Sequence, residues 1–278
     1  TACMNGVSFF FNSRVTEITS LAEGYRLRAG DKELETEYLV NAAGLSSGAI
    51  AEQLGVSGYH IYPCRGEYLI LDQIADELLS VPIYPAPKRG IGGLGVHLTP
   101  TTEGNLLIGP SASYLDDGDD TATTAPVLEQ LFREAKQLLP TLERRQIIGA
   151  YSGNRAKLAP PAEGGFRDFV IRIFPEAPRA VQLLGIESPG LTASMPIAKM
   201  VVKLLGDRCT FAEKQNWNPP RKRPLRFREL PVEQRQRLIS EDPEYGEIVC
   251  RCKQITKREI RDAIEGPLGA RTLTGIKY

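Results

Sequence analysis

The feature that most constrains this fold is a strand that runs into a turn of small residues and then into a helix. The segment 34–40 is a predicted strand, Asn41-Ala42-Ala43-Gly44 is the turn, and 45–54 is the helix. Small residues at such a turn let a ligand approach the backbone closely, because glycine has no side chain to block it. They equally suit a plain tight turn. The arrangement indicates an α/β domain that resembles the last third of a nucleotide-binding domain.

Other predicted strands surround this unit, and a second group of them interrupts the α/β pattern. Strands are predicted at 7–11, 15–18 and 25–29, then at 67–72, 82–85, 95–99 and 105–109, and again at 147–152, 169–173 and 180–185. Predicted helices span 125–139 and 189–206. An antiparallel sheet inside an α/β domain that later resumes predicts the fold class α/β plus α+β, with a cleft between two domains.

Composition excludes several classes of protein. Of the 278 residues, 42% are apolar and 24% charged, as in a soluble globular chain. At about 150 residues per domain this length predicts about two domains. The 34 basic residues balance 34 acidic ones, which argues against nucleic-acid binding. No apolar run reaches the roughly 18 residues of a transmembrane segment. The five cysteines, an odd number, argue against a secreted disulfide framework and predict a cytoplasmic protein.

One glycine motif is misleading. Gly90-Ile91-Gly92-Gly93-Leu94-Gly95 matches the dinucleotide-binding pattern G-x-G-x-x-G letter for letter. In that role the motif must follow a buried strand and begin a helix, so that the pyrophosphate meets the helix N-terminus. Here it follows a Pro-rich segment and precedes a predicted strand. We therefore interpret it as a flexible connection that leads into the strand.

Three side chains are candidates for contact with a small anionic substrate. His97 lies in a predicted strand, where a histidine either packs as an interior residue or accepts a proton near neutral pH. Arg155 follows Gly153-Asn154 at the end of a strand, and Arg65 lies between Cys64 and Gly66. A planar guanidinium can bind a carboxylate or phosphate through two hydrogen bonds. Either arginine also suits a salt bridge between domains.

A flexible segment precedes the second long helix. Gly185 begins it, and Ser188-Pro189-Gly190-Leu191-Thr192 leads into the predicted helix at 189–206. Free backbone N–H groups at a helix start favour an anion or a developing negative charge. Ser188 and Thr192 equally suit the simpler role of capping the helix.

The composition changes beyond residue 210. The stretch 217–237 is rich in Pro and Arg and is predicted to be a solvated linker, with a basic docking patch as the alternative. Cys250-Arg251-Cys252 then follows a predicted strand at 247–249 and precedes a helix at 256–265, with another helix starting near 272. Two close thiols indicate zinc or an iron–sulfur cluster, although either needs four ligands. Cys3, Cys64 and Cys209 show no paired spacing.

Several motifs coincide along the chain. In order they are Val40-Asn41-Ala42-Ala43-Gly44-Leu45, Pro63-Cys64-Arg65-Gly66-Glu67-Tyr68, Leu94-Gly95-Val96-His97-Leu98-Thr99-Pro100, Gly109-Pro110 and Gly190-Leu191-Thr192. This series resembles the FAD-dependent D-amino-acid-oxidase-like superfamily, in the branch of L-2-hydroxyglutarate dehydrogenases and bacterial glycerol-3-phosphate dehydrogenase-like proteins. The resemblance covers about residues 6–205. The tail around Cys250 and Cys252 is similar to the bacterioferritin-associated-ferredoxin-like 2Fe-2S module.

The resemblance implies roles for individual residues. Val15 would lie beside the adenine of FAD, and Ala43 and Gly44 would approach its adenosine side. Gly185, Gly190, Leu191 and Thr192 would bind the cofactor near the isoalloxazine ring. His97, Arg155 and Arg65 would line the substrate side as catalytic residues. Cys250 and Cys252 would hold half of a 2Fe-2S cluster.

The resemblance also implies a domain order and a function. We expect residues 1–62 to be the C-terminal part of a glutathione-reductase-like FAD-binding domain, 63–150 the antiparallel substrate domain, 151–210 the return to the FAD-binding domain, 211–245 the linker, and 246–278 part of a helical cysteine module. The expected activity is FAD-dependent oxidation of a small anionic hydroxy substrate, such as glycerol 3-phosphate or L-2-hydroxyglutarate. A quinone or a redox protein would accept the electrons.

The family pattern also predicts that both ends are truncated, because the G-x-G-x-x-G unit and a second cysteine pair are absent from the sequence. The alternative is a vestigial flavoprotein fragment that acts as an electron-transfer or scaffold module.

Overall fold

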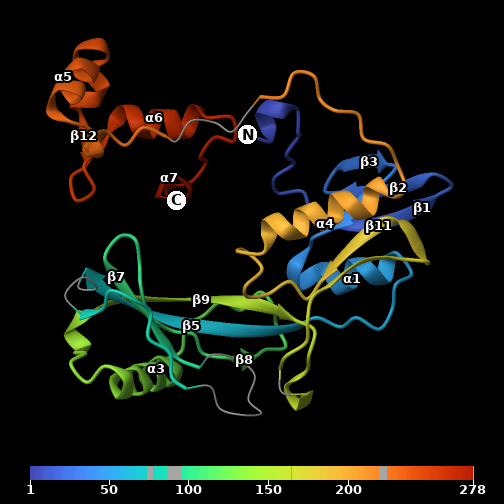
Figure 1. The fold of residues 1–278 in the computed structure, drawn as a ribbon, viewed down its shortest axis with the longest axis horizontal. Coiled ribbons are helices and arrows are strands. Elements are labelled where there is room, and N and C mark those ends of the chain that lie inside the picture. Colours follow the sequence, from blue (N-terminus) through green and yellow to red (C-terminus); the bar gives the residue numbers. More distant parts are fainter. Residues whose placement is uncertain (74–77, 87–94, 164, 219–223, 278) are drawn as a thin grey trace. The chain divides into compact units, whose positions relative to one another are not determined.

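The computed structural model describes residues 1–73, 78–86, 95–163, 165–218 and 224–277 (Figure 1). The described residues pack into two compact units. Residues 13–211 form the larger unit, and residues 1–12 form the smaller one together with residues 212–278.

The first part of the larger unit contains two sheets. An antiparallel sheet is formed by β1 (Val15–Leu21), β2 (Gly24–Ala29) and β3 (Lys32–Thr36). In the second sheet β4 (Leu39–Asn41) runs parallel to β11 (Ala177–Leu184), and β11 pairs antiparallel with β10 (Val170–Phe174). Helices α1 (Ser47–Gln53) and α4 (Ser194–Gly206) both contact β11. Apolar side chains from β2, α1 and β11 share one core, which ties the two sheets together.

The second part of the larger unit is a five-stranded antiparallel sheet. Its strands are β5 (Tyr62–Gln73), β6 (His97–Pro100), β7 (Asn105–Gly109), β8 (Ser113–Tyr114) and β9 (Ile147–Lys157). The long strand β5 pairs with β9 along one edge and with β7 and β8 along the other, while β6 pairs with β7. Helix α3 (Ala125–Leu138) lies along one side of this sheet (Figure 1), where its Leu131, Phe132 and Ala135 share a core with leucines of β5 to β7.

The smaller unit is mostly helical. It contains α5 (Val232–Glu241), a two-stranded sheet of β12 (Ile248–Cys250) and β13 (Ile255–Thr256), and the helices α6 (Lys257–Glu265) and α7 (Leu273–Lys277). Thr256 begins α6 with a capping box, in which its side chain accepts from the Glu259 backbone N–H and the Glu259 carboxylate accepts from the Thr256 backbone N–H. Thr256 is fully buried and makes both of these hydrogen bonds, so it joins the β12–β13 hairpin to α6.

The structure corrects several predictions about individual elements. The strand predicted over 34–40 is divided between β3 and β4, and within the strand predicted over 82–85 only Ile83 forms an isolated bridge, to Leu98. Residues 7–11 form no strand, and the Phe9 ring stacks on Phe11. Helix α4 begins at Ser194 instead of 189, since residues 188–193 form turns around Gly190, a poor helix former. The predicted linker contains helix α5, whose Glu, Gln and Arg residues favour a helix.

The predicted mixed α/β class is confirmed, and the strands expected around residues 25–29, 105–109 and 147–152 are present. Residues 90–94 of the glycine motif lie outside the described residues, as do residues 219–223 of the Pro/Arg-rich stretch. Among the described residues, no helix combines the length and the apolar character needed to cross a membrane.

Candidate functional site

The five-stranded sheet has two chemically different faces. Side chains alternate between the faces along each strand. The strand registers place His97, Tyr68, Tyr151, Gly66 and Arg155 on the same face, which we call the open face. The opposite face packs against α3 through Leu69, Leu98 and Ile108, and we call it the helix face.

Arg155 lies over a glycine on the open face. A methyl group on Gly66 would overlap the Arg155 guanidinium, whose carbon lies 2.8 Å from the point that a Cβ would occupy. Gly66 therefore provides the space in which the guanidinium lies across β5. The Arg155 Nη1 donates to the Ser111 carbonyl at 3.2 Å, and among the described residues the guanidinium forms no ion pair with a carboxylate. Arg155 is therefore a partly exposed cation that is free to bind an anion.

His97 lies at the edge of the same face. Its Nδ1 is 2.9 Å from the Gly95 carbonyl oxygen, and its ring stacks on Tyr84 at 4.4 Å between centroids. A carbonyl oxygen only accepts hydrogen bonds, so Nδ1 carries the proton in this contact. The Nε2 of the neutral ring then has a free lone pair and can accept a proton.

The sequence analysis did not single out the tyrosines between His97 and Arg155. His97 pairs with Gly109, the Tyr68 ring covers Gly109, and Tyr68 pairs with Tyr151. The two tyrosine rings stack with centroids 5.0 Å apart, and burial raises the pKa of Tyr151. The sequence pattern Gly66-x-Tyr68 and Tyr151-x-Gly153 could have predicted this arrangement, because alternation along a strand places the glycine and the tyrosine of each pair on one face.

Cys64 also lies on the open face, beside Arg155. Its side chain is fully buried, and burial raises the pKa of the thiol while the positive charges of Arg155 and Lys157 oppose that rise. Cys64 is therefore a packing neighbour of Arg155 and not an exposed nucleophile.

Arg65 occupies the helix face. Its Nη1 lies 2.8 Å from Asp120 Oδ2, and its Nε lies 3.3 Å from Glu67 Oε1, so both available carboxylates flank it. Glu67 is fully buried and also accepts from the backbone N–H of Thr124 at 2.7 Å, just before α3. The structure therefore does not bring Arg65 together with His97 and Arg155.

The residues predicted for the adenosine side of FAD lie around the end of β4. Ala43 is exposed, Gly44 has φ +55° with open space where its Cβ would be, and Val15 is partly buried at the start of β1. Beneath the turn, Asn41 donates to the Gln182 side chain at 2.7 Å and to the Ser47 carbonyl at 2.8 Å.

Two buried polar atoms beside this turn have no hydrogen-bond partner, the Gln182 Nε2 and the Ser47 Oγ. Unpartnered buried polar atoms below an exposed small-residue turn fit a surface that receives a polar ligand.

The segment before α4 is held to the five-stranded sheet. Lys157 of β9 forms a mostly buried ion pair with Glu187 at 2.9 Å, and also donates to the Gly165 carbonyl at 2.8 Å. Gly185 and Gly190 are buried, whereas Leu191 is 91% exposed and Thr192 is exposed. The loop 185–193 therefore exposes the Leu191 side chain just before α4. The Lys157–Glu187 ion pair fixes the start of this loop to β9, the strand that carries Arg155.

The two cysteines of the smaller unit lie close together. Cys250 ends β12, Cys252 follows in the turn, and their sulfur atoms are 3.3 Å apart. The backbone N–H of Lys253 is the main cause of a lowered pKa of Cys250. Among the described residues no group of three or more potential metal ligands forms.

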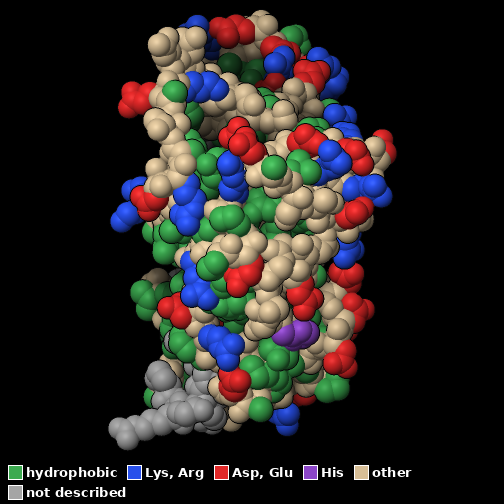
Figure 2. Space-filling model, turned by 90° about the vertical axis from the view of Figure 1, so that its right-hand side faces the viewer, with side chains coloured by type: hydrophobic (Ala, Val, Ile, Leu, Met, Phe, Trp, Pro, Cys, Tyr) green, Lys and Arg blue, Asp and Glu red, His purple; other side chains and the backbone are tan. Residues whose placement is uncertain are grey.

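Charge is distributed evenly over the surface drawn in Figure 2, where acidic and basic side chains are interspersed without a large patch of one sign. The equal totals of 34 basic and 34 acidic residues agree with this picture.

Comparisons with known proteins identify relatives of the chain. The family described as FAD dependent oxidoreductase matches residues 1–204. Glycerol 3-phosphate dehydrogenase of Caloramator mitchellensis is 34% identical over 277 residues, which cover 99% of this chain and 56% of that protein. The mitochondrial L-2-hydroxyglutarate dehydrogenase of Arabidopsis thaliana is 33% identical over 61% of this chain and 38% of its own length.

A solved structure shares the fold. The FAD-bound L-alpha-glycerophosphate oxidase of Mycoplasma pneumoniae superposes with a TM-score of 0.63 at 25% sequence identity, over 74% of this chain and 53% of that one. The chain thus spans about half the length of the relatives that it matches.

Proposed function

The chain belongs to the DAO family of FAD dependent oxidoreductases, and from this premise we propose that it is part of a flavoprotein that oxidises a hydroxyl-bearing carbon of a small anionic substrate. The observation that supports the proposal most strongly is the open face, where Arg155 shares a surface with His97. Among the described residues, Arg155 has no carboxylate partner and His97 has a hydrogen bond only at Nδ1.

Arg155 binds the anionic group of the substrate in this proposal. Its guanidinium is held flat over Gly66 and anchored through the Ser111 carbonyl, so several N–H groups remain for a phosphate or carboxylate. Tyr68 and Tyr151 provide an apolar wall beside it.

His97 accepts the hydroxyl proton of the substrate. The Gly95 carbonyl fixes the ring with its Nδ1 protonated, and Tyr84 holds the ring plane. A base positioned in this way contributes about 10² to 10⁴-fold to the rate of such a step. Arg65 is not part of the proposed site, since it supports the sheet from the opposite face.

The described residues fit part of an FAD site. The exposed Ala43 and the half-buried Gly44, beside the unpartnered Gln182 and Ser47 atoms, would receive the adenosine side of FAD, with Val15 nearby. Gly185, Gly190, Leu191 and Thr192 would line the isoalloxazine side. When bound, FAD supplies the two-electron acceptor for the hydrogen that leaves the substrate carbon.

Glycerol 3-phosphate is the substrate that we propose first. The Caloramator relative that covers 99% of this chain and the oxidase that shares its fold both carry that substrate in their names. L-2-hydroxyglutarate is the second candidate, favoured by the Arabidopsis relative. Both molecules offer an anion for Arg155 and a secondary hydroxyl for His97.

We also propose that Cys250 and Cys252 would hold half of a 2Fe-2S cluster, which would supply one-electron transfer toward a quinone or redox protein. The 3.3 Å separation of the sulfurs and their position on a short hairpin support this assignment. The cluster requires two further ligands beyond these.

The full-length protein that contains this chain tests the proposal. We expect glycerol 3-phosphate, added without oxygen, to bleach the flavin absorbance, and an artificial electron acceptor to support steady turnover. Bleaching by L-2-hydroxyglutarate alone would replace the substrate but keep the reaction. A protein that binds FAD and is reduced by neither would contradict the proposal and favour the non-catalytic alternative.

A further inference from the structure

The smaller unit contains a groove beside the cysteine hairpin that the proposed reaction does not use. It has a volume of about 480 Å³ and runs between α5, the turn before β12 and the turn after it. Its lining is Phe227, Arg235, Ile239, Tyr245, Gly246, Ile248, Arg251 and Gln254. The Phe227 and Tyr245 rings stack with centroids 5.7 Å apart and form its aromatic wall.

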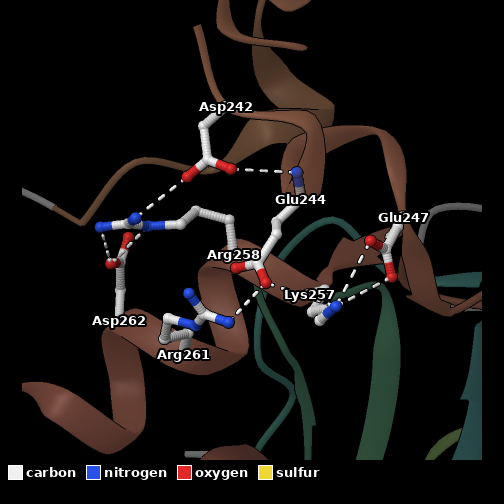
Figure 3. Close-up of polar contacts among 7 residues, drawn as sticks. All are labelled: Asp242, Glu244, Glu247, Lys257, Arg258, Arg261 and Asp262. Atoms are coloured by element: carbon white, nitrogen blue, oxygen red, sulfur yellow. Dashed lines mark hydrogen bonds and ion pairs between the residues drawn. The ribbon is translucent and has the colours of Figure 1, made fainter.

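Most charges elsewhere in this unit neutralise one another. Figure 3 shows the network on α6: Lys257 contacts Glu244 and Glu247, Arg258 contacts Asp242 and Asp262, and Arg261 contacts Glu244. On α5, Arg237 pairs with Glu241 at 2.7 Å. These acidic side chains therefore have basic partners outside the groove, and only the Oε2 of Glu244 among their carboxylate oxygens is buried without a hydrogen-bond partner.

Two arginines of the groove differ from these. Arg235 and Arg251 both line it, and neither forms an ion pair with a carboxylate among the described residues. The Arg235 Nε is buried without a hydrogen-bond partner. A buried donor left without a partner is costly, and an incoming carboxylate oxygen would satisfy it with a charge-assisted hydrogen bond.

The apolar part of the lining continues onto the surface. Ile239 and Ile248 are about two-fifths exposed, and Val249 beside them is 58% exposed. Aromatic residues and arginine around a partly exposed apolar centre form the composition that carries binding energy in protein interfaces. An open groove continuous with exposed apolar residues suits a protein segment better than an enclosed small molecule.

We propose that this groove binds an acidic segment of a partner protein, with carboxylates on Arg235 and Arg251 and an apolar side chain against Phe227 and Tyr245. Arg251 lies between the two cysteines, so a segment bound there is brought to the thiol pair. Given the proposed function, on which the identity of the partner rests, that partner is the protein that accepts the electrons. The Caloramator dehydrogenase alignment takes in this unit, since it covers 99% of the chain.

Direct binding to the whole chain tests the proposal without any turnover. The probe is a fluorescein-labelled peptide, Asp-Glu-Phe-Glu-Asp, followed by fluorescence anisotropy, and the control peptide is Asn-Gln-Phe-Gln-Asn. We expect Arg235→Gln and Arg251→Gln each to weaken binding of the acidic peptide at least about fivefold, the loss that corresponds to roughly 1 kcal/mol. Arg237→Gln is the matched control, because it removes the same charge from the same helix outside the groove.

Each outcome decides for or against the groove. Selective loss in the two groove variants, with Arg237→Gln within about twofold of the original chain, supports it. Equal loss in all three variants, or equal binding of the amide peptide, means unspecific attraction and overturns it. If benzoate displaces the peptide at similar affinity, the groove binds a small aromatic acid. If sedimentation shows that the chain dimerises through the groove, its occupant is a second copy of the chain. Either result overturns the proposal.

Circular dichroism of each variant shows whether the unit remains folded. Peptide binding that persists in a protein without oxidoreductase activity would leave this inference standing while the proposed function fails.

Discussion

Two arginines on opposite faces of one sheet have contrasting surroundings. Arg65, on the helix face, is buried between Glu67 and Asp120. Arg155, on the open face, has a backbone carbonyl, a buried thiol and a glycine as neighbours, and no carboxylate partner among the described residues. Both come from strands that pair with each other, so the sheet itself does not account for the difference.

The contrast distinguishes a structural charge from a functional one. A buried cation needs compensation inside the protein, and Glu67 and Asp120 supply it for Arg65. A cation that binds an anionic ligand must not be paired with a carboxylate of the protein. Arg155 meets this condition among the described residues. Each prediction below tests one side of this difference.

The largest effect is expected on the helix face. Glu67→Ala leaves Arg65 buried beside a missing carboxylate and removes the acceptor for the Thr124 N–H, so we expect a loss of about 3–5 kcal/mol in the free energy of unfolding. Urea denaturation measures it. The control is Glu129→Ala, which breaks an exposed ion pair with Arg144 and should cost at most about 1 kcal/mol. Equal losses of unfolding free energy in Glu67→Ala and Glu129→Ala would contradict the prediction that the buried ion pair matters more than the exposed one.

The next effect concerns catalysis on the open face. His97→Gln should lower kcat at pH 7 by about a hundredfold or more, because the proton acceptor is lost, and should leave the unfolding free energy nearly unchanged. Stopped-flow flavin reduction in the full-length protein measures it. His60→Gln is the control, because His60 precedes β5 and stacks on Tyr62 at the start of that strand, six residues before Tyr68. An unchanged reduction rate in His97→Gln would exclude His97 as the base.

Gly66→Ala should act through Arg155. The added methyl group displaces the guanidinium, so KM should rise about tenfold, as expected when a charged hydrogen bond worth about 1.5 kcal/mol or more is misplaced. Gly153→Ala, directly opposite on β9, is the matched control because nothing lies within 4 Å of its Cβ position. Steady-state kinetics compare the two. Similar KM values in both variants would show that the Arg155 position is unimportant.

The smallest effect is a pH dependence on the helix face. The backbone N–H of Ala122 and the charge of Arg65 hold the pKa of Asp120 below its ordinary value of 3.8. A lowered folded-state pKa stabilises the protein above the unfolded-state pKa, and this contribution is lost as the pH falls through the folded-state value. The stability difference between the original chain and Asp120→Asn should therefore shrink below about pH 4. Urea unfolding of both proteins at pH 3 and pH 7 measures this difference.

Local patterns in the sequence predicted much of this molecule. The alternation in 25–29 identified β2, and the small-residue turn at Asn41–Gly44 located the passage from a strand to a helix, because both depend on neighbouring residues. The single strand predicted over 34–40 is instead divided between β3 and β4, which belong to different sheets. The sequence also placed Arg155 and His97 on strands. Their common face depends on a register that joins residues from four strands, and no local pattern specifies that register.

Arg65 shows a signal that was present but not used. In Cys64-Arg65-Gly66-Glu67 the arginine and glutamate are two residues apart, so a strand places them on one face and favours an ion pair there. The same alternation assigns Gly66 to the opposite face. The partnership of Gly66 with Arg155, by contrast, joins residues far apart in sequence and required the structure.

That partnership has an evolutionary consequence. A side chain at position 66 and an arginine lying across it cannot occupy the same volume, so the two positions do not change independently. Lineages that replace Gly66 with a larger residue should also lose the arginine at position 155, whereas loss of the arginine alone leaves the glycine sterically unaffected. An ancestral reconstruction would therefore place the glycine before the arginine, because only that order passes through sequences in which both residues fit.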